Sequence, residues 1–410
     1  MFTRDEISAA FLNLIHASHR LHPDDMPRVV RDEASRMGLD DLMILLADLE
    51  QRVLIPFVSQ TDVDAPAPPM ASIDGSMAGR AYRTERPLVG DRVDGRTPLW
   101  IPLLDSSERI GVVAASTTAD VDDHVVASAL AFASLVGELL ASKAQYGDAI
   151  TRTRRTRHVT LSAELRWSML PPLTFSGRNV TISGVLEPAY TIAGDTFDYA
   201  VDGEVANVAI IDAVGHGLEA SRIANLAVTA YRHGRRRGLT TVDIYTEMDE
   251  AIADQFGGEK FATAQLATLD LAAGQLCWLN AGHPSPMVIR QLRRIDLQSE
   301  TCLPVGVAFP GSQAEVARFD LEPGDLLLFF TDGVIEARSP GGEQFGRDRL
   351  GDLLAQAGAA SQTPAETVRR LAHAVLEHQE GILQDDGTLL LVVWHGPPAL
   401  HEESRALATP

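Results

Sequence analysis

The sequence predicts an α+β protein of two domains with a helical segment between them. Its 410 residues give two or three domains as a first expectation. Both halves mix helical periodicity with apolar runs typical of strands. In the second half, two sheets flanked by helices would account for the order of these runs, which is an α+β sandwich. The expected boundaries are 1–145 for the first domain, 146–172 for the helical linker, 173–396 for the second domain and 397–410 for a loose tail.

The composition argues against nucleic acid and membrane as partners. The chain has 35 Lys and Arg against 56 Asp and Glu, a formal charge of −21. Phosphate backbones and anionic lipid surfaces attract net positive charge, so this balance opposes both. Two basic runs, Arg152–Arg157 and Arg232–Gly238, are therefore expected to be solvated helix ends.

The cysteines and the apolar stretches predict a cytoplasmic protein. Cys277 and Cys302 have no CxxC spacing and lie in apolar surroundings, which is typical of small buried thiols in a reducing compartment. The first twenty residues carry acids within a helical pattern, unlike a signal peptide. The longest uncharged apolar stretch, Val125–Gly137, is shorter than the ~20 residues that a membrane helix needs.

The first domain begins with helical patterns and continues with strand-like runs. Its expected elements are helices at Ile7–His19 and Met26–Met37, strands at Leu42–Asp48 and Val53–Val58, and a Pro-rich surface loop at Thr61–Pro69. After them come SMAGRAYRTERPLV and IPLLDSSERIGVVAAS, the second a hairpin that turns at DSSER. On these two segments the domain resembles a GAF domain. The resemblance implies a sensor that binds a small molecule or a protein, although no ligand-specific motif is present.

A mostly helical pattern continues from Asp122 to about Leu170, with one looser Arg-rich stretch, and ends at Pro171-Pro172. Such a connector could pair with its copy in a homodimer, or it could pack on its own domains. We favour the homodimer.

Four acidic segments of the second half adjoin apolar runs. They are AGDTFD, AIIDAVGHG, LLLFFTDGV and QDDGTLLLVV. A carboxylate at the tip of a buried strand costs free energy unless it has a partner. Oxygen ligands are what Mg²⁺ and Mn²⁺ prefer, so four such placements predict a divalent-cation site.

Each acid also has an ordinary explanation. Asp212 could cap the helix that follows it. Asp332 precedes Gly333, a strong turn pair, and Asp195 follows a glycine as turn residues do. Asp385 and its neighbour could be solvated loop acids. The set favours a metal site, and no GxSxG, P-loop or GxGxxG motif competes with it.

Residues 160–395 resemble the metal-dependent protein phosphatases of the PPM superfamily, in the bacterial branch that controls sigma-factor regulators. The motifs that carry the resemblance are AELRWSMLPPL, AGDTFD, IDAVGHGLEAS, LNAGHPSPMVI, LPVGV, GDLLLFFTDGVIEAR, FGRDRL and DDGTLLLVV. The resemblance implies an αββα sandwich and a protein serine/threonine phosphatase with two Mn²⁺ or Mg²⁺ ions. The implied substrate is a phosphorylated anti-sigma-factor antagonist, and the implied control comes from the sensor domain.

The resemblance also implies a role for each acid. Asp212 would bridge both ions, with the Ala213 carbonyl on one of them. Asp332 and Asp385 would hold the first ion, and Asp195 would contact the second, through water. Asp198 and Asp386 would support these ligands from behind.

Departures from the family pattern are mild. Ala193 replaces the first glycine of Gly-Gly-Asp, and Ala213 replaces a more common valine. His216 is expected to pack in its loop, and Asn280–His283 to form a structural turn. The sequence nominates no arginine that grips the phosphate. The alternative function is a phosphatase-like module that titrates a regulator without turnover.

Overall fold

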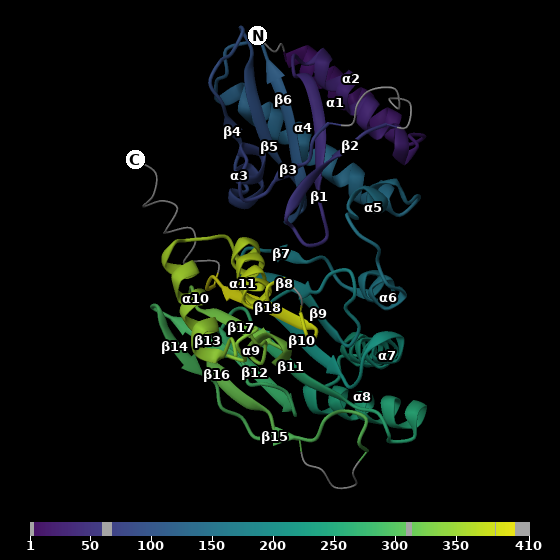
Figure 1. The fold of residues 1–410 in the computed structure, drawn as a ribbon, viewed down its shortest axis with the longest axis vertical. Helices are drawn as coiled ribbons and strands as arrows, with labels where there is room; N and C mark the ends of the chain where they lie inside the picture. The colour runs from purple at the N-terminus through teal and green to yellow at the C-terminus, as the bar shows by residue number, and fades with distance from the viewer. Residues whose placement is uncertain (1–3, 60–67, 309–313, 382, 398–410) are drawn as a thin grey trace. The chain divides into compact units, whose positions relative to one another are not determined.

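The computed structural model describes residues 4–59, 68–308, 314–381 and 383–397 and divides into two compact units (Figure 1). The first unit is Met1–His158 and the second is Val159–Pro410. The Pro-rich loop expected at Thr61–Pro69 falls largely outside the described residues, as does nearly all of the expected tail.

The N-terminal unit is built on a six-stranded antiparallel sheet with the order β3-β2-β1-β6-β5-β4. Its strands are β1 (Asp40–Ala47), β2 (Val53–Phe57), β3 (Ala71–Ser72), β4 (Leu88–Val89), β5 (Thr97–Asp105) and β6 (Glu108–Thr117). Its helices are α1 (Arg4–Ser18), the short 3-10 helix η1 (Pro23–Asp25), α2 (Met26–Arg36), α3 (Met77–Thr84), α4 (Asp123–Ala144) and α5 (Ala149–Thr153).

Alternation along β1 shows how this sheet is covered. Ile44 and Leu46 join the core formed with α1, α2 and α4, whereas Leu45 and Ala47 join the core formed with α3. Successive side chains of a strand point to opposite faces, so one strand contributes to both cores. The predicted strands, helices and DSSER hairpin of this unit are confirmed to within about three residues.

Helix α4 is longer than the apolar stretch counted in the sequence. It has 22 residues and is long and apolar enough to cross a membrane by length and composition. Val125, Phe132 and Val136 of α4 are buried in the N-terminal core. A core helix of this kind passes the same test, so the length alone indicates no membrane.

The segment expected as one helical linker contains two short helices. Helix α5 lies in the first unit, where Arg154 Nε, just after its end, donates to the Ala47 carbonyl at 3.0 Å. Helix α6 (Leu161–Met169) lies in the second unit and contacts α7.

The C-terminal unit contains two six-stranded sheets. One has the order β15-β12-β11-β10-β9 with β16 beside β12, and the other has the order β14-β13-β17-β18-β8-β7. The strands of the first are β9 (Asp195–Asp202), β10 (Val205–Ala213), β11 (Ala262–Asp270), β12 (Gln275–Ala281), β15 (Thr301–Cys302) and β16 (Ala317–Asp320). Those of the second are β7 (Thr174–Ser176), β8 (Val180–Glu187), β13 (Met287–Arg290), β14 (Arg293–Asp296), β17 (Leu326–Phe330) and β18 (Gly387–Trp394).

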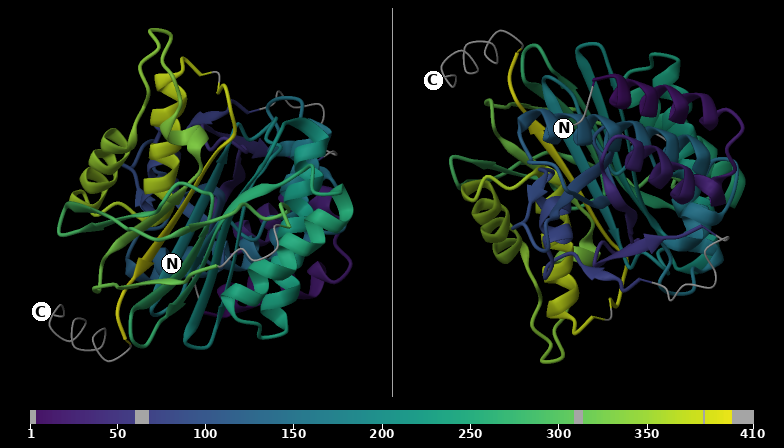
Figure 2. Two further views of the ribbon diagram at one scale, coloured as in Figure 1. Left: turned by 90° about the horizontal axis from the view of Figure 1, so that it is seen from below. Right: turned by 90° about the horizontal axis from the view of Figure 1, so that it is seen from above.

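Helices cover the outer face of each sheet, giving four layers (Figure 2). Helices α7 (Gly217–Arg236) and α8 (Thr241–Phe256) pack on the first sheet. Helices α9 (Asp332–Ile335), α10 (Arg347–Ala359) and α11 (Pro364–His378) pack on the second. Phe197, Trp278 and Phe329 lie among the apolar side chains between the sheets. The predicted arrangement of two sheets flanked by helices is confirmed, whereas the sequence indicated no strand at β9 or at the short strands β7 and β13–β16.

Both cysteines are free and half-buried. The sequence-based expectation that they are buried was therefore wrong in degree. Cys302 Sγ donates to the Asn280 carbonyl at 3.1 Å, a polar contact at the edge of the first sheet.

Candidate active site

The alternation of β9 and β10 directs two predicted acids into the space between the sheets. In β10, Val208 and Ile210 face the inter-sheet core, and Asp212 follows on the same face. In β9, Asp195 shares its face with Phe197 of that core. The two acids are directly opposite each other in the β9–β10 register. Both carboxylates therefore lie at one end of the sandwich interior.

A threonine from the second sheet fixes the orientation of Asp195. Thr331, just after β17, donates from Oγ1 to Asp195 Oδ2 at 2.6 Å. Thr331 Oγ1 in turn accepts a hydrogen bond from the Thr388 backbone N–H at 2.9 Å. Thr331 is fully buried, so this chain of bonds joins the two sheets at the site. From the sequence, Thr331 was expected only to shape the turn at Asp332, and Thr388 was assigned no role.

Asp386 holds the backbone in front of β9. Its Oδ2 accepts from the N–H groups of Ala193 and Gly194, each at 2.8 Å. Two backbone donors on one carboxylate oxygen fix the chain just before Asp195. The role of Asp386 behind the metal ligands stays a prediction.

Two glycines allow the segments to approach. A Cβ at Gly333 would lie 1.9 Å from the Asp386 carbonyl oxygen and 3.5 Å from Asp385 Cβ. A Cβ at Gly194 would lie 2.6 Å from the Ala213 carbonyl oxygen. Any side chain at Gly333 would therefore push Asp332 and Asp385 apart.

Burial and mutual repulsion raise the pKa values of the acids. The pKa of Asp212 rises to about 7 because of burial and the nearby charges of Asp332, Asp385 and Asp386. Burial, with Asp212 and Asp386 close by, also raises the pKa of Asp195 well above its usual value. The pKa of Asp332 is raised by burial and by Asp385. Like charges gathered in a half-buried site favour a bound cation or a proton.

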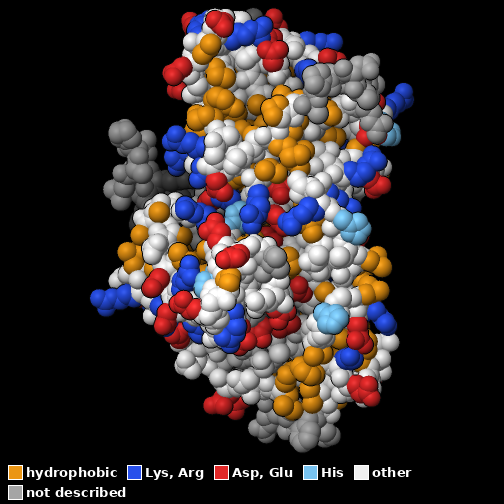
Figure 3. Space-filling view, in the orientation of Figure 1, with side chains coloured by type: hydrophobic (Ala, Val, Ile, Leu, Met, Phe, Trp, Pro, Cys, Tyr) orange, Lys and Arg blue, Asp and Glu red, His pale blue; other side chains and the backbone are white. Residues whose placement is uncertain are grey.

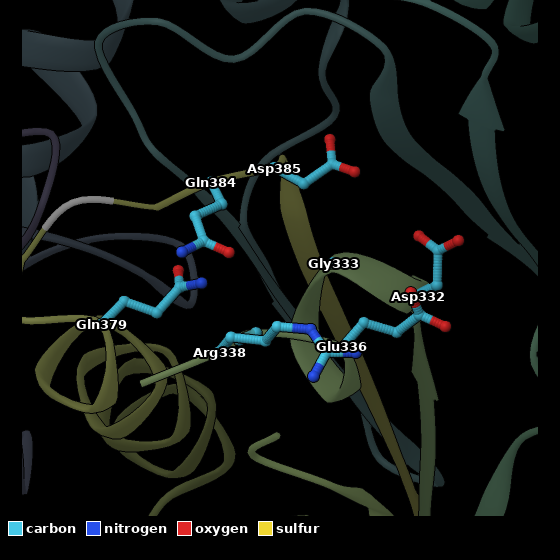
Figure 4. Close-up of a pocket in the computed structure, with 8 residues that line it drawn as sticks. Asp332, Gly333, Glu336, Arg338, Gln379, Gln384 and Asp385 are labelled. Carbon is cyan, nitrogen blue, oxygen red and sulfur yellow. The ribbon is translucent and has the colours of Figure 1, made fainter. Parts of the chain in front are cut away.

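The donors at the site fit a hard cation by chemistry. They are carboxylate oxygens with the Ala213 carbonyl beside them, which is the ligand type of Mg²⁺ and Mn²⁺. The carboxylates of Asp332 and Asp385 project to the same side in Figure 4. Within the described residues, no three His, Cys, Asp or Glu side chains converge closely enough to hold an ion as they stand. The strand ends and loops that carry the acids lie together, but their carboxylates are not close enough to share one coordination sphere.

Asp198 faces away from this cluster. It lies on the opposite face of β9 from Asp195 and is paired with Arg232 at 2.7 Å and Arg235 at 2.9 Å, both on α7. The Asp198 carboxylate of both ion pairs is buried, since this residue is 1% exposed. Arg232 and Arg235 are therefore not solvated helix ends, and the expectation for that part of the basic run was wrong.

A buried arginine lies near the cluster and was missed by the sequence analysis. Arg166 of α6 is fully buried and donates to the Ser221 carbonyl at 3.1 Å and to Asn225 Oδ1. Burial lowers the pKa of Arg166 to about 10, although the charges of Asp195 and Asp386 oppose that shift. Helix α6 thus brings one positive charge toward the acidic site.

The histidines have different positions. His216 is exposed at the N-cap of α7 and makes no capping hydrogen bond, so the expectation that it packs in its loop was wrong. His283 is buried, its backbone N–H donates to Asn280 Oδ1 at 2.8 Å, and its Nδ1 lies 2.7 Å from Thr263 Oγ1. Burial lowers the pKa of His283 to about 3, so it is neutral. The predicted structural turn at Asn280–His283 agrees with these contacts.

The acidic site opens into a polar pocket. The pocket has a volume of about 220 Å³ and is lined in part by Asp332, Asp385, Glu336 and Arg338. On the face of the C-terminal unit shown in Figure 3, acidic side chains gather with Lys and Arg side chains beside them.

Comparison with known proteins shows which domains the C-terminal unit resembles. Residues 202–395 match the family described as stage II sporulation protein E (SpoIIE). The phosphoserine phosphatase RsbU of Bacillus subtilis is 24% identical over 238 residues, covering 57% of this chain and 69% of RsbU. The C-terminal unit is similar to SpoIIE-type PP2C phosphatase domains. Such domains occur in metal-dependent protein serine/threonine phosphatases.

Other relatives match only part of their own length or have low structural similarity. Protein IcfG of Synechocystis sp. is 24% identical over 241 residues, covering 52% of this chain and only 37% of IcfG. The RsbU and RsbW domains of a Mycobacterium tuberculosis protein are 26% identical, with 53% of this chain and 62% of that chain covered and a TM-score of 0.46. This TM-score is too low for the structural likeness to support the assignment. The SpoIIE match begins at residue 202, so it contains Asp212, Asp332 and Asp385, whereas Asp195 precedes it.

Proposed function

We propose that this chain is a signalling phosphatase that hydrolyses phosphoserine or phosphothreonine on a regulatory protein. The observation that supports it best is the meeting of Asp195 and Asp212, from the first sheet, with Asp332 and Asp385, from segments next to the second sheet. In the hydrolysis, a water oxygen bonds to phosphorus, the bond from phosphorus to the serine oxygen breaks, and that oxygen takes a proton. Inorganic phosphate and the free hydroxyl are the products.

The proposed ligands of two Mn²⁺ or Mg²⁺ ions are the carboxylates of Asp195, Asp212, Asp332 and Asp385 and the Ala213 carbonyl. Bound ions of this kind lower the pKa of water and stabilise charge on phosphoryl oxygens. Asp212 lies at the centre of the set, since it interacts with the charges of Asp332, Asp385 and Asp386. This supports its proposed role as a ligand that would help to hold the ions.

The remaining side chains would hold these ligands in place. Thr331 orients Asp195 through its 2.6 Å hydrogen bond, and Asp386 fixes the backbone before Asp195. A proton on Asp212 competes with a cation, because the pKa of this acid is about 7 in the absence of an ion. Binding of an ion at neutral pH would thus release a proton.

The substrate and the control are proposals drawn from the relatives. RsbU is named as a phosphoserine phosphatase, and sigma-factor regulation is typical of its family. A phosphorylated anti-sigma-factor antagonist is therefore the proposed substrate, in the cytoplasm. The N-terminal unit, with its six-stranded sheet covered on both faces, is proposed as a GAF-like sensor. Residues 146–172 are proposed to transmit its signal and to contribute to a homodimer.

The alternative is a binding module that titrates a regulator without turnover. One observation favours it, namely that no three potential ligands among the described residues converge closely enough for an ion. The oxygen chemistry and the raised pKa values of the acids favour the enzyme.

The experiment that separates the two is turnover of a phosphoserine peptide with and without Mn²⁺. The enzyme requires Mn²⁺-dependent release of phosphate that is lost in both Asp212→Asn and Asp332→Asn. Absence of release at any Mn²⁺ concentration, with regulator binding retained, would establish the binding module instead.

A further inference from the structure

The polar pocket beside Asp332 and Asp385 has the size of a subsite. Its volume of about 220 Å³ is smaller than the ~300–1,000 Å³ of cavities that enclose a whole small molecule. Its lining residues are Asp332, Gly333, Glu336, Ala337, Arg338, Gln379, Gln384 and Asp385. A pocket of this size suits a few groups of a larger ligand that continues outside it.

Gln379 is a buried polar side chain without a complete set of partners. It is 6% exposed, and its Oε1 has no hydrogen-bond partner among the described residues. It caps the C-terminal end of α11, and its amide projects into the pocket (Figure 4). A buried acceptor left unsatisfied costs about 1–3 kcal/mol, so its presence at a pocket wall points to a donor supplied by a ligand.

Gln384 places a second amide at the same wall. Its side chain also projects into the pocket, and it is exposed. A side-chain amide offers both N–H donors and a carbonyl acceptor, as a peptide backbone does. Two such amides match the alternating donors and acceptors of an extended peptide.

Arg338 gives the pocket a positive charge. Of the described residues that line the pocket it is the one cation, and Asp332, Glu336 and Asp385 are the acids. Its Nη1 donates to the Gly342 carbonyl at 3.1 Å, and the side chain is exposed. A guanidinium has five N–H donors, so most of its donor capacity remains for an anionic group.

We propose that this pocket binds the peptide segment that carries the phosphorylated residue, and that it determines substrate selectivity. Gln379 and Gln384 pair with the backbone of that segment, and Arg338 pairs with an acidic side chain beside the phosphorylated residue. The adjacent carboxylates place the phosphate next to the same pocket. This inference rests on the proposed phosphatase function and adds the substrate class, an acidic phosphoserine peptide.

The first test compares two substrates in the full-length protein with Mn²⁺. One is a phosphoserine peptide with Asp or Glu next to the phosphoserine, and the other is p-nitrophenyl phosphate, which has no peptide. In Arg338→Gln and Gln379→Leu we expect kcat/KM for the peptide to fall about tenfold relative to p-nitrophenyl phosphate, through a higher KM. Arg293→Gln, which removes an exposed charge from β14 outside the pocket, should leave the ratio unchanged.

The stability of Gln379→Leu provides a second measurement. Leucine removes the unsatisfied acceptor at similar size, so Tm should stay the same or rise while peptide turnover falls. A lower Tm with an equal loss on both substrates would show a merely structural role and overturn the proposal. An unchanged ratio of the two kcat/KM values would overturn it as well.

Peptide binding is measured separately from turnover. Fluorescence anisotropy of a labelled phosphopeptide on Asp212→Asn, alone and combined with Gln379→Leu, should show about tenfold weaker binding in the double variant. If the wild type hydrolyses neither substrate, the proposed function fails, and this binding measurement still decides the pocket. Equal affinity of the two variants for the phosphopeptide would overturn the proposal that this pocket binds the peptide.

Discussion

A buried polar cluster in the N-terminal unit and the acidic site of the C-terminal unit differ in how their polar groups are paired. In the N-terminal unit, Arg109 is 6% exposed and shares the Gln51 Oε1 acceptor with the Tyr82 hydroxyl, each at 3.0 Å. Its guanidinium also lies 4.6 Å from the Tyr82 ring centroid. In the C-terminal unit, Asp195, Asp212 and Asp332 lie in one acidic cluster, and their pKa values are raised by burial and by neighbouring carboxylates. Matched polar groups stabilise a fold, whereas unmatched charges mark the place where a fold binds something.

The largest expected effect is on turnover. Replacing Asp212 or Asp332 by asparagine removes the charge of a proposed metal ligand. We expect the loss of several kcal/mol of transition-state stabilisation to lower kcat by about 10³-fold or more. Steady-state hydrolysis of p-nitrophenyl phosphate with Mn²⁺ measures it. The control is Asp352→Asn on the exposed side of α10, which should keep wild-type kcat. Wild-type activity in both Asp212→Asn and Asp332→Asn would show that the acidic cluster of the C-terminal unit is not an active site.

A pair of glycine variants compares the units directly. A Cβ at Gly111 would lie 1.9 Å from the Leu45 carbonyl, and a Cβ at Gly333 would lie 1.9 Å from the Asp386 carbonyl. Each alanine variant should lose about 3 kcal/mol or more of stability in its own unit. Only Gly333→Ala should also lower turnover, by about 100-fold, because it separates Asp332 from Asp385.

Thermal unfolding followed by calorimetry, with activity at a temperature where both units are folded, measures these effects. A loss of turnover in Gly111→Ala at that temperature would show that packing in the N-terminal unit reaches the catalytic unit.

The pH dependence of stability should differ between the units without metal. The pKa of Asp212 is raised in the folded state from 3.8 to about 7, so the folded state holds this proton more tightly than the unfolded state. Stability of the C-terminal unit should therefore fall as pH rises from about 4 to about 7 and level off above, by roughly 2–4 kcal/mol. Asp212→Asn should remove most of this slope. An unchanged slope in Asp212→Asn would assign the dependence to other groups.

The smallest expected effect is stabilisation by metal. Mn²⁺ at 100 times its Kd should add about 2.7 kcal/mol, or roughly 5–10 °C in Tm, to the C-terminal unit. The transition of the N-terminal unit should not move. Calorimetry of the wild type and of Asp212→Asn with Mn²⁺ checks this, and an equal shift in both proteins would mean that the ion binds elsewhere.

Much of the fold could be predicted from local patterns. The apolar runs of β10, β17 and β18 and the periodicity of α7 and α8 indicated their structures directly. Strand β9 was missed because AGDTFD lacks a long apolar run, and its pairing with β10 supplies what the local sequence does not. The helical pattern predicted from Asp122 onward contains α4, which is longer than its uncharged apolar stretch because Glu138 and Lys143 interrupt that stretch without ending the helix.

The sequence by itself predicted which acids form the site. Asp212, Asp332 and Asp385 each adjoin a strand that its own apolar pattern defines, whereas Asp195 begins β9, which has no long apolar run. Tertiary structure decided their environment. The hydrogen bond from Thr331 to Asp195 joins residues 136 positions apart, and Asp198, three residues after Asp195, faces α7 instead of the site. Only the tertiary structure shows that Arg166 is buried and that Gln379 Oε1 has no hydrogen-bond partner among the described residues. Local pattern fixes the face on which a side chain lies, whereas burial, partners and charge depend on segments that only the folded chain brings together.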